Sequence, residues 1–313
     1  MPDPSVFMLM GPTASGKTEE VLELAERLPI EVVSVDSSMV YRGLDIGTAK
    51  PGRAERERVP HHLIDILDPQ EPYSAGRFVE DAGSAIRLIQ ARGRLPFLVG
   101  GSFLYFRAWL AGLSPLPPAH PAIRADIEVR AKRRGWPALH AELARIDPDA
   151  AGRIHPNDRQ RVGRALEVYE ATGQSLTQLW KIHRVKTSTP CHRMVLEVTD
   201  RVALRERVER RLSQMLDEGW VEEVRALMRR GDLGVHLPAI RSVGYLPIWR
   251  HLEAGTDWEQ TRNAIITETL QLAKRQMTWL RSLDADARWP VENPAWRRHL
   301  AAMVGRWAQS DLC

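Results

Sequence analysis

Cysteine is scarce in this sequence, and its scarcity excludes two ways of stabilising a small fold. The 313 residues contain two cysteines, Cys191 and Cys313, and no Cys-x-x-Cys pair. A disulfide framework or a structural zinc site needs more cysteines at closer spacing. We therefore expect a protein of a reducing, cytoplasmic setting.

Long apolar runs are also missing. No stretch approaches the roughly 18–20 apolar residues that a membrane-spanning helix needs. The first residues lack the basic start and the cleavage site of a signal peptide. We expect no membrane partner. The 313 residues suffice for one large core and a smaller second domain. With 43% apolar and 27% charged residues, the chain has the balance of an ordinary globular protein.

The positive charge is unevenly distributed, although the net charge is only +4. Lysine and arginine outnumber acidic residues in 124–193 and cluster again in 201–211 and 225–230. Such runs are typical of solvated helix faces. They also suit a surface that binds a polyanion, because basic side chains neutralise phosphates and release counterions. Charge alone does not decide between these interpretations.

The first 100 residues alternate between short apolar runs and amphipathic segments. Apolar or β-branched runs predict strands at 5–10, 30–35 and 95–99, and helical spacing predicts helices at 17–28 and 76–92. Strands that alternate with helices favour a parallel α/β sheet.

A proline-rich stretch at 115–121 interrupts this alternation. Beyond it, helices are predicted at 121–134, 136–146 and 157–172. The last of these has Asn157 as its predicted N-cap, with Gln160 three residues later as in a capping box.

The α/β pattern then resumes with a predicted strand at 194–199 and long helices at 201–230 and 257–283. We therefore expect a core formed by 1–115 and 193–313, with 116–192 as an all-helical insertion domain. Trp220 sits at apolar spacing in the helix predicted at 201–230 and is expected to be a core side chain.

One octapeptide has a well-defined physical meaning. The segment Gly11-Pro12-Thr13-Ala14-Ser15-Gly16-Lys17-Thr18 matches the P-loop pattern G-x-x-x-x-G-K-[ST] between a predicted strand and a predicted helix. Its glycines let backbone N–H groups curl around an anion, its lysine adds a positive charge, and the hydroxyl of Thr18 can hold Mg²⁺. The motif predicts a bound phosphate group but not the reaction.

Two further side chains follow predicted strands. Asp36 comes after the second strand, and Ser102 follows Gly100-Gly101 after the third. Ligands of open α/β sheets bind at the carboxyl ends of strands, so both side chains should face the P-loop. The position alone leaves Asp36 open as a Mg²⁺ ligand, a general base or a helix cap, and Ser102 as a site residue or a cap.

These residues are part of a series of motifs that resembles bacterial tRNA dimethylallyltransferases over about residues 5–283. The series begins with the P-loop and occurs in the family's order. Its other members are Asp36-Ser37-Ser38-Met39-Val40-Tyr41 with 42–51, His61-His62-Leu63-Ile64-Asp65, Val99-Gly100-Gly101-Ser102-Phe103-Leu104-Tyr105, 112–117, Arg153-Ile154-His155-Pro156-Asn157-Asp158, Gln160-Arg161 with Arg164, Arg241-Ser242-Val243-Gly244-Tyr245, and Ala273-Lys274-Arg275-Gln276 with Thr278-Trp279.

The resemblance implies a P-loop NTPase-like parallel sheet with helices on both faces, and a monomer that transfers a dimethylallyl group from dimethylallyl diphosphate to N6 of adenosine 37 of tRNA. It implies that Asp36, Ser102 and Lys17 are catalytic, that residues 11–18 bind the diphosphate with Mg²⁺ as cofactor, and that the helical insertion contacts the anticodon stem-loop. The positions implied to contact tRNA are Asp36, Ser37, Ser38, Met39, Ser102, Arg124, Gln160, Arg161, Val162, Gly163, Arg164, Arg241, Ser242, Val243, Gly244, Tyr245 and Leu246.

The sequence departs from the family's pattern at four positions. Ser102 stands where the family usually has Thr, Gly163 replaces Ser, and Leu246 and Leu270 stand where Arg is common. Candidate anion contacts that remain are Arg207, Arg211, Lys274 and Arg275.

The reaction that the resemblance implies suits these residues. Backbone N–H groups, Lys17 and Mg²⁺ would stabilise the leaving pyrophosphate. The allylic carbon needs a dry pocket, and Asp36 would take the proton from the adenine amine. The adenine must be unstacked to enter.

Two side-chain arrangements in the sequence carry separate expectations. On the predicted helix 157–172, Arg161 and Arg164 should be largely free to meet RNA, while Val162, Leu166 and Tyr169 pack into the insertion's core. The pair His61-His62 lacks further ligands at metal-binding spacing, so we expect a packing role.

Three other functions remain open on the motifs alone. A small-molecule kinase or NTPase would use the P-loop and Asp36 for ATP, but a lid as large as 116–192 is unusual. A prenyltransferase of free adenylate would need no helical insertion. An RNA-binding protein with a dead site would not need an intact Lys17, Thr18 and Asp36.

Overall fold

The computed structural model describes residues 6–112, 116–182 and 190–311. Contacts divide the chain into two compact units, Met1–Phe106 with Ser188–Cys313, and Arg107–Thr187. The insertion predicted at 116–192 thus corresponds to a unit whose boundaries both lie earlier in the chain.

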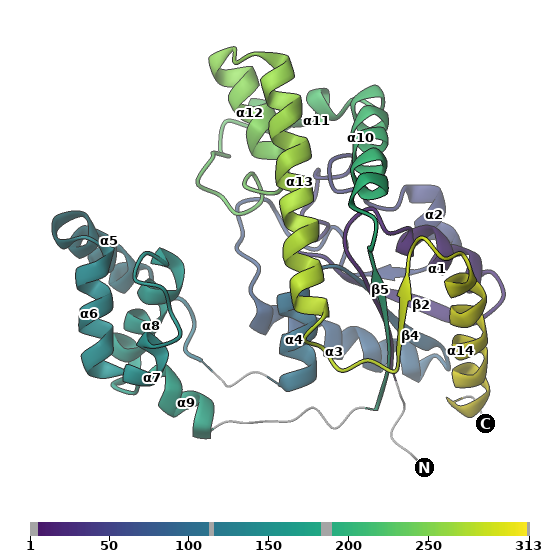
Figure 1. Ribbon diagram of the computed structural model, residues 1–313, viewed down its shortest axis with the longest axis horizontal. Coiled ribbons are helices and arrows are strands. Elements are labelled where there is room, and N and C mark those ends of the chain that lie inside the picture. Colours follow the sequence, from purple (N-terminus) through teal and green to yellow (C-terminus); the bar gives the residue numbers. More distant parts are fainter. Residues whose placement is uncertain (1–5, 113–115, 183–189, 312–313) are drawn as a thin grey trace. The chain divides into compact units, whose positions relative to one another are not determined.

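The first unit is built on a six-stranded sheet in the order β3-β2-β4-β1-β5-β6, in which every pairing is parallel (Figure 1). The predicted parallel α/β fold is confirmed. The strands are Val6–Met10 (β1), Ile30–Val35 (β2), His61–His62 (β3), Leu95–Gly100 (β4), Cys191–Glu197 (β5) and Ala287–Pro290 (β6).

Helices cover both faces of this sheet. On one face, α1 (Lys17–Ala25) and α14 (Ala295–Asp311) enclose a core in which the rings of Phe7 and Phe97 stack at 4.8 Å and Trp307 lies 5.6 Å from Phe7. On the other face, α3 (Ala75–Ala91) packs against β2 and β4 (Figure 1). The buried side chains of α14 recur at helical spacing, so this helix, which was not predicted, had a recognisable signal.

Four helices stand beyond the carboxyl ends of the strands and share a second core (Figure 1). They are α10 (Arg201–Asp217), α11 (Trp220–Arg229), α12 (Tyr245–Ala254) and α13 (Trp258–Leu280). The single helix predicted at 201–230 is wrong, because Gly219 adopts φ 95° and breaks it. Glycine has no Cβ and takes this left-handed conformation at little cost. Trp220, which opens the new helix, is a core side chain as predicted.

The regular elements of the second unit, within its described residues, are all helices. It contains α5 (Pro121–Arg134), α6 (Trp136–Ile146), α7 (Pro148–Ala151), α8 (Arg159–Thr172) and α9 (Leu176–Ile182). The predicted N-cap of α8 is wrong by one residue, since the Asp158 side chain accepts the N–H of Arg161 at 3.1 Å. Two elements complete the described chain: α2 (Arg53–Arg58) and α4 (Phe103–Ala111). No helix within the described residues is both long and apolar enough to cross a membrane.

Candidate active site

Three strand ends meet at one edge of the sheet. The P-loop follows β1, Asp36 follows β2, and Gly100-Gly101-Ser102 closes β4. Because β2, β4 and β1 are neighbours, these segments touch: the Gly11 N–H donates to Gly100 O at 3.3 Å, and the Ser102 N–H donates to Val35 O at 3.1 Å. The structure therefore brings together the three segments that the sequence placed at strand ends.

The P-loop is wrapped tightly around its own lysine. Lys17 Nζ donates to Gly11 O at 2.9 Å, Pro12 O at 2.7 Å and Ser15 Oγ at 3.0 Å. Gly16 adopts φ 79° and Ala14 φ 59°, so the loop turns through conformations that are rare for residues with side chains. The first N–H groups of α1, which have no partners within the helix, follow directly and favour an anion.

Gln276 on α13 holds the P-loop to the end of β4. Its Oε1 accepts the N–H of Thr13 at 2.9 Å, and its Nε2 donates to Gly101 O at 3.0 Å. A Cβ on Gly101 would lie 2.4 Å from that nitrogen, so only glycine leaves room for the contact. Sequence reasoning assigned no role to Gln276, although it lies in one of the matching motifs.

Asp36 divides its carboxylate between two tasks. Its Oδ1 accepts the N–H groups of Ser38 at 2.7 Å and Met39 at 3.2 Å, which shapes the turn after β2. Among the described residues, none donates a hydrogen bond to Oδ2. Ser102 Oγ accepts the N–H of Ser37 at 3.0 Å. The hydroxyl thus reaches the neighbouring strand end instead of capping its own helix.

A cavity of about 370 Å³ lies over these strand ends, within the first unit. Lys17, Asp36 and Thr18 line it, whereas Ser102 does not. The predicted tRNA contacts that line it are Asp36, Ser38, Met39, Ser242, Val243 and Tyr245; those of the first unit that do not are Ser37, Ser102, Arg241, Gly244 and Leu246. Ser242 Oγ lies 3.1 Å from Ser38 Oγ, which ties two of these segments together.

Two cations face each other in this cavity. Burial, with the nearby charge of Arg211, lowers the pKa of Lys17 to about 7 against the opposing influence of Asp36. Burial also lowers the pKa of Arg211, and Asp36 again opposes the shift. Among the described residues, Arg211 has no hydrogen-bond or ion-pair partner. Two half-buried cations with one carboxylate form a site that an anion would stabilise.

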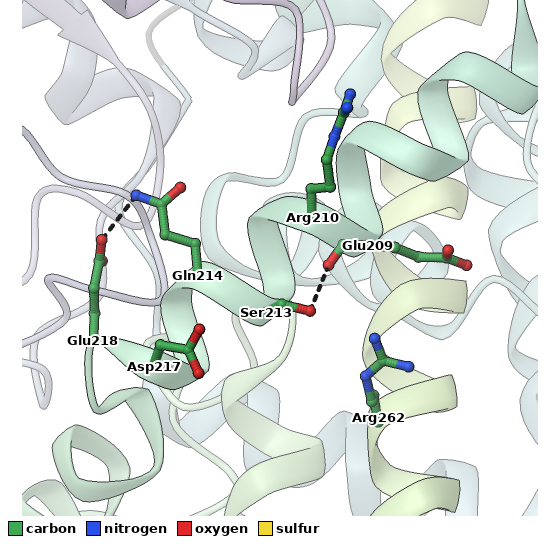
Figure 2. Close-up of a pocket in the computed structure, with 7 residues that line it drawn as sticks. All are labelled: Glu209, Arg210, Ser213, Gln214, Asp217, Glu218 and Arg262. Atoms are coloured by element: carbon green, nitrogen blue, oxygen red, sulfur yellow. Dashed lines mark hydrogen bonds between the residues drawn. The ribbon is translucent and has the colours of Figure 1, made fainter.

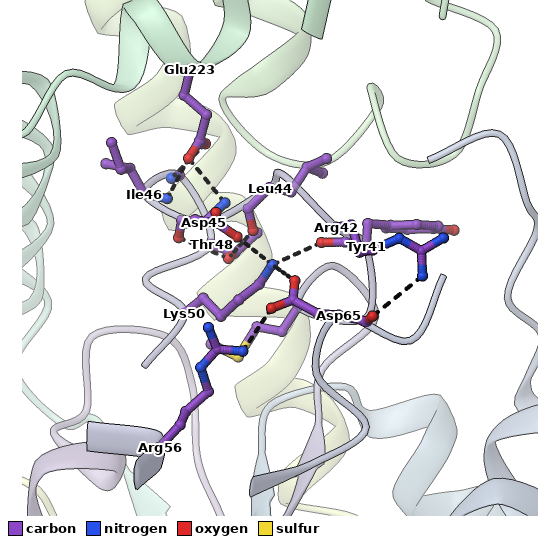
Figure 3. Close-up of polar contacts among 12 residues, drawn as sticks. Tyr41, Arg42, Leu44, Asp45, Ile46, Thr48, Lys50, Arg56, Asp65 and Glu223 are labelled. Carbon is purple, nitrogen blue, oxygen red and sulfur yellow. Dashed lines mark hydrogen bonds and ion pairs between the residues drawn. The ribbon is translucent and has the colours of Figure 1, made fainter. Parts of the chain in front are cut away.

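The loop 41–50 contributes Gly47 and Thr48 to the cavity lining and is held by ion pairs of Lys50 (Figure 3). Lys50 Nζ contacts Asp45 Oδ1 and Asp65 Oδ1, both at 2.5 Å, and donates to Tyr41 O at 2.8 Å. The Glu223 carboxylate of α11 accepts the N–H groups of residues 45, 46 and 47 at 3.0, 2.7 and 3.3 Å. The loop belongs to one of the motifs that resemble the family, but its residues had no predicted role. Hydrogen bonds from residues 45–47 to Glu223 fasten the loop to α11.

The described residues contain no cluster of three or more His, Cys, Asp or Glu side chains arranged to hold a metal ion. His62 Nε2 pairs with Glu31 Oε2 at 2.7 Å, which fits the predicted packing role. His61 Nδ1 lies 2.6 Å from Val59 O, but His61 also lines the cavity. Mg²⁺ commonly needs few protein ligands, because phosphates and waters complete its shell. The Thr18 hydroxyl, exposed at the cavity, fits a Mg²⁺ that arrives with a diphosphate.

In the helical unit, the prediction that Arg164 is largely free to meet RNA is wrong, because its guanidinium is held by other residues of the protein. The side chain of Glu167, 1% exposed, accepts from Arg164 Nη1 at 2.8 Å and from Arg124 Nε at 2.8 Å, and Arg164 Nη2 donates to Pro117 O at 2.6 Å. Burial favours the neutral carboxyl, but hydrogen bonds from Arg124, Arg164 and the His120 N–H outweigh it and hold the pKa of Glu167 below its usual range.

The other predicted contacts of this unit differ in exposure. The side chain of Arg161 is 61% exposed and pairs with Asp158 at 3.4 Å; Gln160 is also exposed. Val162 is fully buried, so its side chain belongs to the core and not to a surface. The expected burial of Tyr169 is wrong, since it is 37% exposed. Helix α8 contacts α5, α6 and α9, so more than one of its faces is buried, including the position of Val162. Tyr169 lies near the end of α8, where its side chain is more exposed.

A second, more open hollow lies between α10 and α13 (Figure 2). Polar side chains line it and partly satisfy one another, as Gln214 Nε2 donates to Glu218 Oε1 at 2.9 Å. It contains no P-loop or strand-end residue, so the cavity over the strand ends is the candidate active site.

The fold and the cavity define a P-loop protein of the α/β class whose site suits a phosphorylated small molecule. Residues 39–283 match the model of the IPP transferase family, and residues 4–65 match the model described as isopentenyl transferase. The chain belongs to the IPP transferase family.

Individual relatives agree with this assignment. A tRNA dimethylallyltransferase of Alkalilimnicola ehrlichii is 52% identical over 97% of this chain and 96% of its own. One of Methylococcus capsulatus is 54% identical over 91% and 92%. The solved tRNA isopentenylpyrophosphate transferase of Bacillus halodurans is 35% identical, covers 98% of both chains and has a TM-score of 0.70. A eukaryotic dimethylallyltransferase acting on tRNA is 25% identical over 96% of this chain and 77% of that one, with a TM-score of 0.78.

Proposed function

We propose that this protein transfers a dimethylallyl group from dimethylallyl diphosphate to N6 of adenosine 37 of tRNA. The observation that carries the proposal is one cavity lined by the P-loop, two half-buried cations, a carboxylate with a free oxygen and apolar side chains. An anionic leaving group, an allylic carbon and a proton to be removed require these three environments.

The diphosphate is bound by the P-loop, Lys17 and Arg211. Lys17 leaves its contacts with Gly11, Pro12 and Ser15 to meet the anion, and the anion keeps it protonated. Arg211 gains the partner that it lacks among the described residues. Thr18 would hold Mg²⁺, which would supply positive charge beside the leaving group.

The reaction exchanges one bond for another. The bond between C1 of the dimethylallyl group and the diphosphate oxygen breaks, the bond between adenine N6 and C1 forms, and pyrophosphate leaves with the electron pair. The proton of N6 passes to Asp36 Oδ2, which accepts no hydrogen bond from any described residue. Because Oδ1 is held by two backbone N–H groups, the carboxylate is already oriented.

The tRNA is recognised through its anticodon stem-loop, and the protein acts as a monomer in the cytoplasm. The exposed Arg161 and Gln160 of the helical unit and the exposed Arg241 of the first unit suit phosphate and base contacts with a single-stranded loop.

The test compares two phosphorylated substrates. The protein is incubated with bulk tRNA, Mg²⁺ and either labelled dimethylallyl diphosphate or labelled ATP. We expect label from dimethylallyl diphosphate in the tRNA and no phosphoryl transfer from ATP. Label transferred from ATP, with none from dimethylallyl diphosphate, would establish the kinase alternative instead.

A further inference from the structure

One apolar part of the cavity includes a tryptophan. Val208, Leu212 and Met215 of α10 and Ile265 and Leu272 of α13 line it together with Trp220, the first residue of α11. Trp220 is 2% exposed and is the largest side chain in the lining. This wall is close to the chemistry, because Gly244, which touches the indole, lies two residues from Ser242, and Ser242 contacts the turn that Asp36 shapes.

The indole is wedged between two stretches of backbone. A Cβ on Gly47 would lie 2.0 Å from Trp220 Nε1, and a Cβ on Gly244 would lie 2.1 Å from its Cη2. Both positions therefore need glycine while the indole stays where it is. Nε1 is buried without a hydrogen-bond partner among the described residues, so packing alone fixes the ring.

The two sides of this wedge are themselves fixed. Glu223 accepts the N–H groups of Asp45 and Ile46 (Figure 3) and also that of Gly47, which holds this stretch of backbone beside α11. Tyr245 donates to Glu223 Oε1 at 2.6 Å and meets the indole edge-on at 5.5 Å. One carboxylate thus holds both the loop and the aromatic neighbour against Trp220, and the wall has no room to swing aside.

We propose that Trp220 sets the length of the prenyl chain that the site accepts, stopping it at one five-carbon unit. The inference rests on the proposed function, because it places the dimethylallyl group in the apolar part of the cavity. A ten-carbon geranyl chain would need the space that the indole fills. The glycines and Glu223 make this limit rigid, since a buried wall that cannot relax excludes added carbons.

The matched pair of variants is Trp220→Leu and Trp249→Leu. Both tryptophans are buried in the same apolar cluster, at 2% and 5% exposure, but Trp249 does not line the cavity. Transfer to tRNA is measured with dimethylallyl diphosphate and with geranyl diphosphate. We expect Trp220→Leu to raise the kcat/KM of the geranyl substrate relative to the dimethylallyl substrate by about tenfold or more, while Trp249→Leu leaves the ratio as in the parent.

Each outcome has a distinct meaning. A parent that fails to use dimethylallyl diphosphate refutes the proposed function. An active parent with a folded Trp220→Leu variant and an unchanged ratio refutes the inference alone. If Trp220→Leu does not melt cooperatively, the comparison is made between the parent and Trp220→Phe. The parent should use geranyl diphosphate poorly, and Trp220→Phe should have a higher kcat/KM for geranyl diphosphate relative to dimethylallyl diphosphate. A parent that uses both substrates equally well would overturn the proposal.

Discussion

At the residue scale, Asp36 shows how one carboxylate serves structure and chemistry together. Oδ1 is committed to the N–H groups of Ser38 and Met39, and Oδ2 has no hydrogen-bond partner among the described residues. An amide in place of the carboxylate keeps an oxygen acceptor for the turn but cannot take a proton in this role. Asparagine at this position therefore separates the two tasks.

We predict that Asp36→Asn lowers the rate of a single turnover by about 10²–10⁴-fold, the usual size of a general-base contribution. The affinity for tRNA and the melting temperature should stay close to those of the parent, because the turn is retained. Rapid-quench measurement of product checks the rate. A variant that reacts as fast as the parent would remove Asp36 from the mechanism.

Lys17 makes binding of the diphosphate depend on pH. Burial and Arg211 lower the pKa of Lys17 to about 7 in the free protein, and a bound diphosphate raises it again. Above this pKa, binding must therefore take up a proton, and affinity falls as the pH rises. Below it, Lys17 is already charged and contributes no proton uptake.

Calorimetry in two buffers of different ionisation enthalpy measures this uptake. When the diphosphate binds, we expect Lys17 to take up almost no proton at about pH 6 and roughly one proton at about pH 8–9. Subtracting the uptake of Lys17→Met removes protons that belong to the diphosphate itself. Identical proton uptake in parent and variant at both pH values would show that Lys17 keeps its ordinary pKa.

At the scale of elements, α8 combines a buried network with an exposed contact surface. Arg164 and Arg124 hold the buried Glu167, whereas Arg161 pairs with Asp158 on the surface. Two arginines on one helix thus have different roles, which the sequence spacing did not distinguish.

Single alanine variants of these arginines should behave differently. Arg164→Ala leaves Glu167 without one of its donors and should lower the stability of the helical unit by about 1–3 kcal/mol. Arg161→Ala should leave the thermal melt unchanged, weaken tRNA binding and flatten its dependence on salt. Melting curves, with tRNA affinity at two salt concentrations, check both. Equal melting temperatures for the parent and Arg164→Ala, or an unchanged salt slope in Arg161→Ala, would contradict these roles.

The elements that the sequence predicted are those with local signals. The strands at β1, β2 and β4 and the helices α5 and α6 follow from apolar periodicity and from proline or glycine at their ends. Periodicity continues across Gly219, so the break between α10 and α11 was missed. Strand β3 has only two residues and exists through its pairing with β2, which no local pattern indicates.

The site could be predicted only in part, because local sequence patterns do not indicate contacts between distant segments. Strand order explains why the P-loop, Asp36 and Ser102 converge, and the motifs gave their positions. Gln276, Glu223 and Trp220 act through contacts that join segments distant in sequence, such as Gln276 with Thr13 or Trp220 with Gly47. Their roles needed the folded chain.

At the scale of the whole molecule, the proposed function requires a diphosphate site in the first unit and RNA contacts in both units. The acceptor atom of the dimethylallyl group is the feature that defines this function. A P-loop alone is compatible with many reactions, so the place where the dimethylallyl group ends distinguishes this account from a kinase and from a prenyltransferase of free adenylate.

The most direct measurement is therefore to locate the product. tRNA treated with the protein, dimethylallyl diphosphate and Mg²⁺ is digested with nucleases, and the fragments and nucleosides are identified by mass spectrometry beside reactions that contain free AMP instead. The account predicts N6-dimethylallyladenosine at position 37, beside the anticodon, and none on AMP. A modified AMP with unmodified tRNA, or a dimethylallyl group at another atom or position, would contradict it.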